Sequence, residues 1–368
     1  MAGALYHPIY LFLVFILTVY VMKIYAQPSV DNSHFNYSID ELADNNFIAK
    51  SPYHIFSFIL AIGLALFIGF RPICDEFVDM VDYNYTYSYL MGSHFFFDFD
   101  VDNLIYDNWF TYMASNNVPV RVFFLIVSIV YFGLIWLACR KLFTDNTLLA
   151  FLVYLAALST FTYATNGIKA GMATSIFLCA LAYYDKPLIS VPIALLTYGM
   201  HHSMLLVIVA YFCVLLVKNP KYYFIVWGVS FCMAALHITW FQHYFAGFTD
   251  EHGASYLLSS RNSGFRIDFI IYSAVPVIIG YWMIFKNNLY SRTYDIILNL
   301  YLLTNSVWML CMYSNFTNRI AYLSWFIYPI VLLYPFVNLY WSDRQDRYLK
   351  YVVYGHLGFT MFMNFVYS

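Results

Sequence analysis

Residues 118–139 read VPVRVFFLIVSIVYFGLIWLAC, and Arg140 and Lys141 follow directly. A run of about 20 mostly apolar residues is long enough to cross the hydrocarbon core of a bilayer as a helix. The same pattern, an apolar run with charged residues at its ends, fills most of the chain. The chain is 62% hydrophobic and only 10% charged, with a mean hydropathy of +0.65. This composition is far from that of a soluble domain, and we expect an all-α polytopic membrane protein.

The apolar runs predict about twelve transmembrane helices in a single integral membrane domain, residues 1–368. They lie near residues 5–26, 52–70, 118–139, 147–165, 168–184, 188–200, 203–217, 222–241, 267–285, 294–312, 320–340 and 350–367. The first run lacks the basic start and the cleavage site of a signal peptide, so we expect it to remain as a span. The sixth and seventh runs are short and separated only by His201 and His202, which predicts tilted or broken helices. An arrangement like that of the GT-C glycosyltransferases is one form that such a bundle can take.

Lysines and arginines in the connections predict the orientation of the bundle. One set of connections holds Lys23, Lys50, Arg140, Lys141, Lys186, Lys218, Lys221, Lys286, Arg292, Arg344, Arg347 and Lys350. The other set holds Arg71, Arg121, Lys169, Arg261, Arg266 and Arg319. Because cytoplasmic connections carry the excess of positive charge, we expect the first set inside and both chain ends outside. Two long connections, residues 71–117 and 242–266, then lie on the outer, periplasmic face, where we expect the chemistry.

Four of the outer cations stand at the ends of apolar runs. They are Arg71, Lys169, Arg266 and Arg319. Coming from four parts of the chain, they could converge on one anionic ligand at the outer membrane surface. Arginine binds a phosphate through its planar fork, and lysine contributes a point charge. For each of them taken singly, the alternative is a side chain that reaches out to the lipid headgroups.

A carboxylate and a histidine are candidates for acid–base chemistry at the same face. Asp75 precedes Asp79 by four residues, so the two share one face if this segment is helical. A carboxylate near Arg71 can orient or deprotonate a hydroxyl. His202, at the outer end of the sixth run, could act as a general base or donate a hydrogen bond to a sugar or phosphate. A solvated acidic loop and a structural histidine are the alternatives.

Metal and cofactor signals are weak. Asp98, Asp100 and Asp102 alternate with apolar residues, and such spacing holds a divalent cation in some glycosyltransferases, but so short a pattern is commonly accidental. The six cysteines are scattered without metal-ligand spacing. We therefore expect neither a metal site nor a disulfide, no other cofactor, and no nucleic-acid partner.

Several segments together resemble one family. Arg71-Pro-Ile-Cys-Asp75, Asn166-Gly-Ile-Lys-Ala170, His202-Ser203 and Asn318-Arg319-Ile-Ala-Tyr322 are similar, in this order, to elements of the EpsG family of polysaccharide-biosynthesis membrane proteins, which is related in role to Wzy-type polymerases. Asp107 matches a carboxylate that precedes the third span. The chain departs from the family pattern where Lys169 replaces arginine, where Ala170 replaces glutamine, and at Met200-His201, where an aromatic residue usually precedes the histidine.

The resemblance implies a protein of the bacterial inner membrane that acts in capsule, exopolysaccharide or O-antigen assembly. It would be a glycosyltransferase that joins oligosaccharide repeat units carried on undecaprenyl diphosphate, on the periplasmic face. Its partners would be the lipid-linked oligosaccharide, membrane lipids and other polysaccharide-assembly proteins.

The roles that follow are expectations. Asp75 or His202 would be the base, and Arg71, Lys169, Arg266 and Arg319 would bind the diphosphate. Asp107, Asn166, Tyr256 and Tyr322 would contact the substrate.

Three other functions are compatible with the sequence. An O-antigen-ligase-like or other lipid-linked glycosyltransferase would share the architecture, and the length of its product would separate it from a polymerase. A flippase or transporter of lipid-linked sugars would carry ionisable residues near the middle of its spans and would show inverted repeats. Here the charges stand at the ends of the runs and no repeat is visible. A purely structural assembly subunit is the third alternative.

Overall fold

The computed structural model describes residues 3–25, 52–246, 254–255, 257 and 264–366, and this part of the chain contains helices and no strand. The elements are η1 (Gly3–Leu5), α1 (Tyr6–Tyr25), α3 (Pro52–Gly69), η3 (Asp75–Phe77), α4 (Val78–Leu90), α5 (Leu104–Ser115), α6 (Val120–Phe143), η4 (Thr144–Asn146), α7 (Thr147–Leu155), α8 (Leu158–Thr165), α9 (Ile168–Ala182), α10 (Pro187–Met200), α11 (Met204–Leu216), α12 (Pro220–Ala235), α13 (Phe241–Ala246), α15 (Ile267–Tyr281), the π-helix η5 (Trp282–Lys286), α16 (Arg292–Leu310), α17 (Thr317–Trp325), α18 (Tyr328–Val337) and α19 (Gln345–Phe365).

Each predicted apolar run coincides with one helix or with two consecutive helices. Among the residues that the structure describes, four helical stretches are long and apolar enough to cross a membrane: Gly3–Ile24, Val120–Leu155, Ile267–Lys286 and Thr317–Val337. Shorter apolar helices occupy Tyr53–Gly69, Ile168–Ala182, Pro187–Met200 and Met204–Leu216. The helical membrane protein is therefore confirmed, and the number of crossings stays a prediction.

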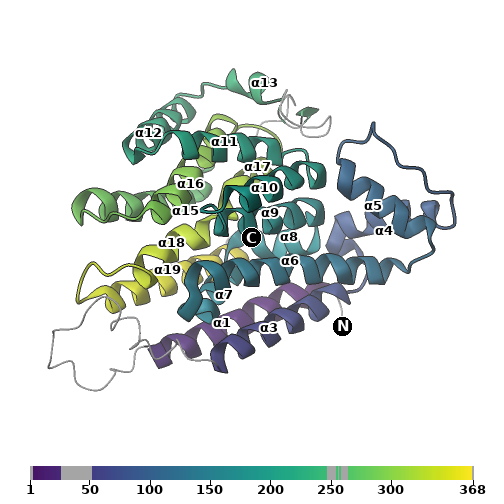
Figure 1. Ribbon diagram of the computed structural model, residues 1–368, viewed down its shortest axis with the longest axis horizontal. Coiled ribbons are helices and arrows are strands. Elements are labelled where there is room, and N and C mark those ends of the chain that lie inside the picture. Colours follow the sequence, from purple (N-terminus) through teal and green to yellow (C-terminus); the bar gives the residue numbers. More distant parts are fainter. Residues whose placement is uncertain (1–2, 26–51, 247–253, 256, 258–263, 367–368) are drawn as a thin grey trace.

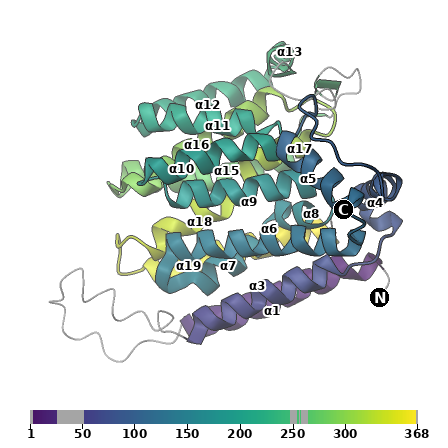
Figure 2. The same cartoon turned by 45° about the vertical axis from the view of Figure 1, so that its right-hand side comes forward.

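The helices form a stack with roughly aligned axes. Figure 2 shows the stack running from α12 on one side to α1 and α3 on the other, with α4 and α5 at one end of it. These two helices belong to the connection 71–117, so this connection is largely helical. Figure 1 shows α4 and α5 at the same end, near the beginning of the chain. We call this the α4–α5 end, and the other the opposite end.

The outermost helices expose apolar side chains. On α1, Phe12 is 65% exposed and Ile16 47%, and on α12 Ile225 is 61% exposed. All nine residues of α7, in contrast, are buried. Such bare apolar faces are uncommon on soluble proteins, whereas in a bilayer they contact acyl chains.

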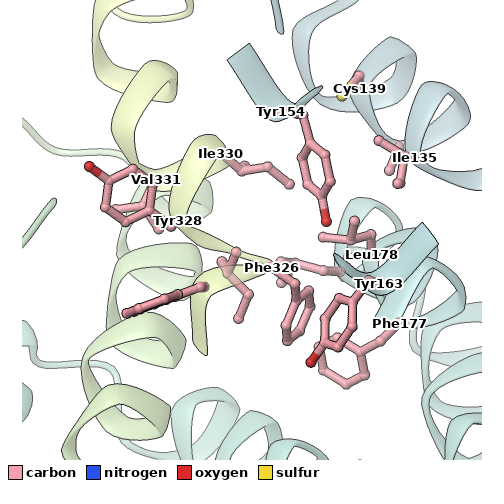
Figure 3. Close-up of a cluster of buried hydrophobic side chains, with 14 of the residues drawn as sticks. Ile135, Cys139, Tyr154, Tyr163, Phe177, Leu178, Phe326, Tyr328, Ile330 and Val331 are labelled. Carbon is pink, nitrogen blue, oxygen red and sulfur yellow. The ribbon is translucent and has the colours of Figure 1, made fainter. Parts of the chain in front are cut away.

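Aromatic rings fill the centre of the stack. Figure 3 shows Tyr154, Tyr163 and Phe177, from α7, α8 and α9, beside Phe326 and Tyr328 at the junction of α17 and α18. The Phe177 and Phe326 rings meet edge to face, with centroids 5.9 Å apart. This arrangement is favourable for aromatic pairs, and it joins the broken α17–α18 segment to α9.

The fourth predicted span is broken between α7 and α8, at Ala156 and Ala157. Side chains bond four carbonyl groups near the break. The pairs are His356 Nε2 with Val153 at 3.1 Å, Thr160 Oγ1 with Tyr154 at 2.7 Å, Tyr10 Oη with Leu155 at 2.8 Å and Thr360 Oγ1 with Ala156 at 2.7 Å. An unsatisfied carbonyl in hydrocarbon is costly, so these bonds from α1 and α19 hold the break in place.

A polar network holds α17, which carries one of the predicted cations. Asn305 Nδ2 lies 3.1 Å from Ser273 Oγ and 3.0 Å from Ser324 Oγ, and its Oδ1 accepts a bond from Trp227 Nε1 at 2.9 Å. Trp325 Nε1 donates to Ser273 at 2.8 Å. The network ties α17 to α12, α15 and α16 through bonds that are well suited to a membrane interior.

Candidate functional site

Arg71 joins two helix ends at the α4–α5 end. It follows α3 directly and is only 2% exposed. Its Nη1 donates to the carbonyl of Ile68 and its Nη2 to the carbonyl of Thr165, each at 2.8 Å, so the ends of α3 and α8 are linked. Its Nε is buried and has no hydrogen-bond partner within the described residues. Burial lowers the pKa of Arg71 to about 10, which leaves the side chain charged at neutral pH.

The turn between α8 and α9 depends on a glycine. A Cβ on Gly171 would lie 2.5 Å from the carbonyl oxygen of Tyr163, so only glycine allows α9 to begin so close to α8. The Tyr163 ring meets that of Tyr322 on α17, with centroids 5.4 Å apart. In the turn, the Oδ1 of Asn166 is buried, like the Tyr163 hydroxyl, and neither has a partner within the described ranges. Of the two predicted substrate contacts in this region, Asn166 lies in the turn and Tyr322 packs against Tyr163.

Lys169, in the first turn of α9, forms an ion pair with Asp107 on α5. The distance from Nζ to Oδ1 is 2.7 Å, and the two side chains are 24% and 25% exposed. Asp107 Oδ2 accepts bonds from the backbone N and from Nδ2 of Asn103, both at 3.1 Å. Because Asn103 immediately precedes α5, this bond caps the start of the helix. The Asp107 carboxylate is thus held on both sides.

Two tyrosines, Tyr83 of α4 and Tyr106 of α5, stand beside the ion pair, and we call them the tyrosine pair. Their ring centroids are 6.4 Å apart. Lys169 Nζ lies 5.2 Å from the centroid of Tyr106 and 6.0 Å from that of Tyr83.

The charges of Arg71 and Arg319 affect the pKa values of the tyrosine pair. Burial raises the pKa of Tyr83, nearby carboxylates raise it further, and the charge of Arg319 opposes them. Burial likewise raises the pKa of Tyr106, and the charge of Arg71 opposes it. The charges of Arg71, Lys169 and Arg319, from three distant parts of the chain, are therefore close enough to act on one pair of rings.

Arg319 is the most accessible of these three cations. It stands in the first turn of α17, and its side chain is 50% exposed. Its Nη2 lies 3.6 Å from Asp79 Oδ1 on α4, and its guanidinium lies 5.2 Å from the ring of Phe316. Phe316 has a left-handed backbone with φ of 50°, and this turn sets the start of α17.

His202 is joined to the same region through its backbone. The chain leaves α10 at Met200 and enters α11 at Met204, so the helix break expected at the two histidines is present. The backbone N of His202 donates to Asn103 Oδ1 at 3.0 Å, and its ring lies 4.9 Å from that of Tyr198. Asn103 thus links His202 to Asp107 and, through it, to Lys169.

The remaining predicted site residues are Asp75, Arg266 and Tyr256. Asp75 is exposed in η3, outside α4, so it does not share a continuous helix with Asp79. Arg266 makes a two-pronged contact with Asp268, with Nε–Oδ1 at 3.0 Å and Nη2–Oδ2 at 2.6 Å. Tyr256 lies outside the described residues.

The aspartates at 98–102 are used in the local turn. Asp98 Oδ1 accepts a bond from the backbone N of Asp100 at 2.9 Å. The side chain of Asn108 accepts a bond from the backbone N of Asp98 through Oδ1 and donates one to the Asp98 carbonyl through Nδ2. Within the part of the chain that the structure describes, no three His, Cys, Asp or Glu side chains are grouped as metal ligands would be.

The family model that matches this chain is that of the EpsG family, over residues 54–368. The chain belongs to the EpsG family. This family is one of membrane proteins of polysaccharide biosynthesis. No curated protein and no solved structure matches the chain. The matched range includes all the candidate site residues of this EpsG-family protein.

Sequence reasoning missed Tyr83 and Asn103, whereas Tyr106 lies among the aromatic residues of 95–110 that we expected to stack on sugar rings. Two pairs of residues in the sequence have spacings that could have indicated Tyr83 and Asn103. Asp79 and Tyr83 are four residues apart and so share a face of α4. Asn103 and Asp107 are four residues apart, so on a helix the Asp107 side chain can reach back to Asn103.

Proposed function

We propose that this EpsG-family protein polymerises oligosaccharide repeat units carried on undecaprenyl diphosphate, at the periplasmic face of the bacterial inner membrane. The product would be a capsule, exopolysaccharide or O-antigen chain. One observation carries the proposal: at one end of the stack Lys169 lies beside the tyrosine pair, Arg319 lies 3.6 Å from Asp79, four residues before Tyr83, and the charge of Arg71 acts on Tyr106. Family membership supports the coarser role in polysaccharide biosynthesis.

Arg319 is the cation best suited to bind the departing diphosphate. Its side chain is half exposed, and its contact with Asp79 is long, at 3.6 Å. A diphosphate carries more negative charge than one carboxylate and can accept two parallel hydrogen bonds from a guanidinium. The diphosphate would therefore displace Asp79 from Arg319. The positive charge of the guanidinium would then stabilise the diphosphate as the bond to the sugar breaks.

Lys169 and Arg71 would act in different ways. Lys169 is held by Asp107 and supplies a fixed positive charge beside the tyrosine pair. Arg71 is buried and already bonds two carbonyl groups, so it chiefly positions α3 and α8. Its Nε is the guanidinium nitrogen that has no partner among the described residues. Arg266 would contribute to the diphosphate site only after leaving Asp268.

The chemistry is the transfer of a sugar chain to a hydroxyl. The acceptor hydroxyl oxygen forms a bond with the anomeric carbon of the donor, and the bond from that carbon to the diphosphate oxygen breaks. The electron pair leaves with undecaprenyl diphosphate, and the hydroxyl proton passes to a base. His202, linked to Asp107 through Asn103, is the base we favour, and exposed Asp75 is the alternative.

Product length in reconstituted membranes tests the proposal. Full-length protein is supplied with lipid-linked repeat units, and the products are sized. We expect long polymer from the wild type and only single units from Arg319→Ala. Arg121→Ala changes an exposed arginine at the start of α6 and is the control, for which we expect long polymer.

Two results would contradict the proposal. Long polymer from a correctly inserted Arg319→Ala variant would show that Arg319 does not bind the departing diphosphate. Transfer of units by the wild type without elongation would instead identify a ligase.

A further inference from the structure

A second polar pocket lies at the opposite end of the stack. Its cavity of about 270 Å³ opens between the end of α11 and the beginning of α16. The polar side chains that line it are those of Lys218, Tyr290, Ser291, Arg292, Asp295 and Asn299. None of them belongs to the site around the tyrosine pair. The volume is near the lower end for small-molecule sites, so the pocket is the right size for a small polar group.

The pocket offers both positive and negative charge. Lys218 and Arg292 are exposed, and Asp295 is half buried. Across the described ranges, none of the three forms an ion pair. Two cations beside one carboxylate fit a ligand that itself carries both signs of charge.

A buried acceptor in the pocket lacks a donor. Asn299 is 1% exposed, and its Oδ1 has no hydrogen-bond partner among the described residues. A buried polar atom without a partner is costly, and this one belongs to a side chain that lines the cavity. A ligand with an N–H group would satisfy it.

An apolar stripe leads away from the pocket along α11. Val209, Cys213 and Leu216 are exposed at spacings of four and three residues, which places them on one face of the helix. Leu216 is 82% exposed and stands two residues before Lys218. Lipid chains that follow this face would bring their headgroup to the pocket.

We propose that this pocket binds the headgroup of a zwitterionic lipid with a primary ammonium group, as in phosphatidylethanolamine. Lys218 and Arg292 hold the phosphate, and Asp295 and the Oδ1 of Asn299 accept bonds from the ammonium. The lipid chains lie along the exposed face of α11. This site is separate from the proposed polymerase site and does not depend on it.

Native mass spectrometry of the full-length protein in detergent tests the site. Phosphatidylethanolamine and phosphatidylcholine are titrated separately, because their phosphates are alike but the methylated ammonium of phosphatidylcholine has no N–H to donate. We expect phosphatidylethanolamine to bind about tenfold more tightly. Asp295→Asn should remove this preference, and Arg292→Gln should weaken the binding of both lipids. Arg347→Gln, an exposed arginine on α19, is the control and should bind as the wild type does.

Three outcomes would overturn the proposal. The wild type could bind the two lipids equally, or Arg292→Gln could bind phosphatidylethanolamine as tightly as Arg347→Gln does. Water-soluble phosphoethanolamine could displace the lipid at equal concentration, which would identify a soluble ligand instead.

Discussion

The two arginines of the candidate site differ in their surroundings. Arg71 is 2% exposed and bonds two backbone carbonyl groups, whereas the Arg319 side chain is 50% exposed and lies 3.6 Å from the Asp79 carboxylate. A buried guanidinium bound to the backbone stabilises the fold, while an exposed one is available to a ligand.

Replacing Arg71 with alanine should therefore destabilise the protein. The change leaves the carbonyl group of Thr165 without its side-chain donor, while that of Ile68 keeps the bond from the backbone N of residue 71. One unsatisfied buried carbonyl group costs about 1–3 kcal/mol. Thermal unfolding in detergent measures the loss. Arg319→Ala should unfold close to the wild-type temperature; equal losses for both variants would refute this division of roles.

The ion pair between Lys169 and Asp107 should show energetic coupling. Both side chains are about a quarter exposed and lie 2.7 Å apart, and we expect a coupling of about 1 kcal/mol, at the upper end for exposed pairs. Lys169→Met, Asp107→Asn and the double variant form the cycle, read by unfolding free energies. Strictly additive losses would show that the pair contributes no interaction energy.

At the scale of elements, the close crossing of α8 and α9 places Lys169 and Asn166 at the site. A Cβ on Gly171 would be 2.5 Å from a backbone oxygen, whereas one on Gly133 of α6 would meet nothing within 4 Å. These two glycines thus provide a matched comparison.

Gly171→Ala should force α9 away from α8. Overpacking of this kind costs about 1–3 kcal/mol, and it also shifts Lys169 relative to the tyrosine pair. We expect a lower unfolding temperature and shorter polymer, with Gly133→Ala close to wild type in both assays. Wild-type behaviour of Gly171→Ala would mean that the crossing is looser than described.

The sequence predicted the helical elements well because an apolar run and its polar ends are local signals. The break at His201 and His202 could be predicted in the same way. The tyrosine pair could not, because Tyr83 and Tyr106 look like ordinary aromatic residues until α4 and α5 fold back together. Arg71 and Arg266 were predicted as diphosphate ligands from charge and position alone. The Thr165 carbonyl that Arg71 bonds is 94 residues away, a tertiary contact that no spacing shows, whereas the Asp268 partner of Arg266 is only two residues away.

For the whole molecule, the two ends of the stack carry different amounts of positive charge. Most lysines and arginines stand at the helix ends opposite α4 and α5, as Figure 2 allows the reader to follow. Positive charge favours the cytoplasmic side, so the candidate site should face outward and the lipid pocket inward.

Labelling of single cysteines tests this orientation. Ser93, between α4 and α5, and Arg347, at the start of α19, are both exposed. In intact cells, a membrane-impermeant thiol reagent should label Ser93→Cys and leave Arg347→Cys unlabelled, with the native cysteines as background. Labelling of Arg347→Cys alone would reverse the topology.

Direct binding of undecaprenyl diphosphate to the full-length protein in nanodiscs is the measurement closest to the central claim. We predict tighter binding of the diphosphate than of undecaprenyl monophosphate, and a loss of about tenfold in affinity for Arg319→Ala, as expected when a charge-assisted bond is removed. Arg121→Ala should retain wild-type affinity. Equal affinity of Arg319→Ala and Arg121→Ala for the diphosphate would contradict the account.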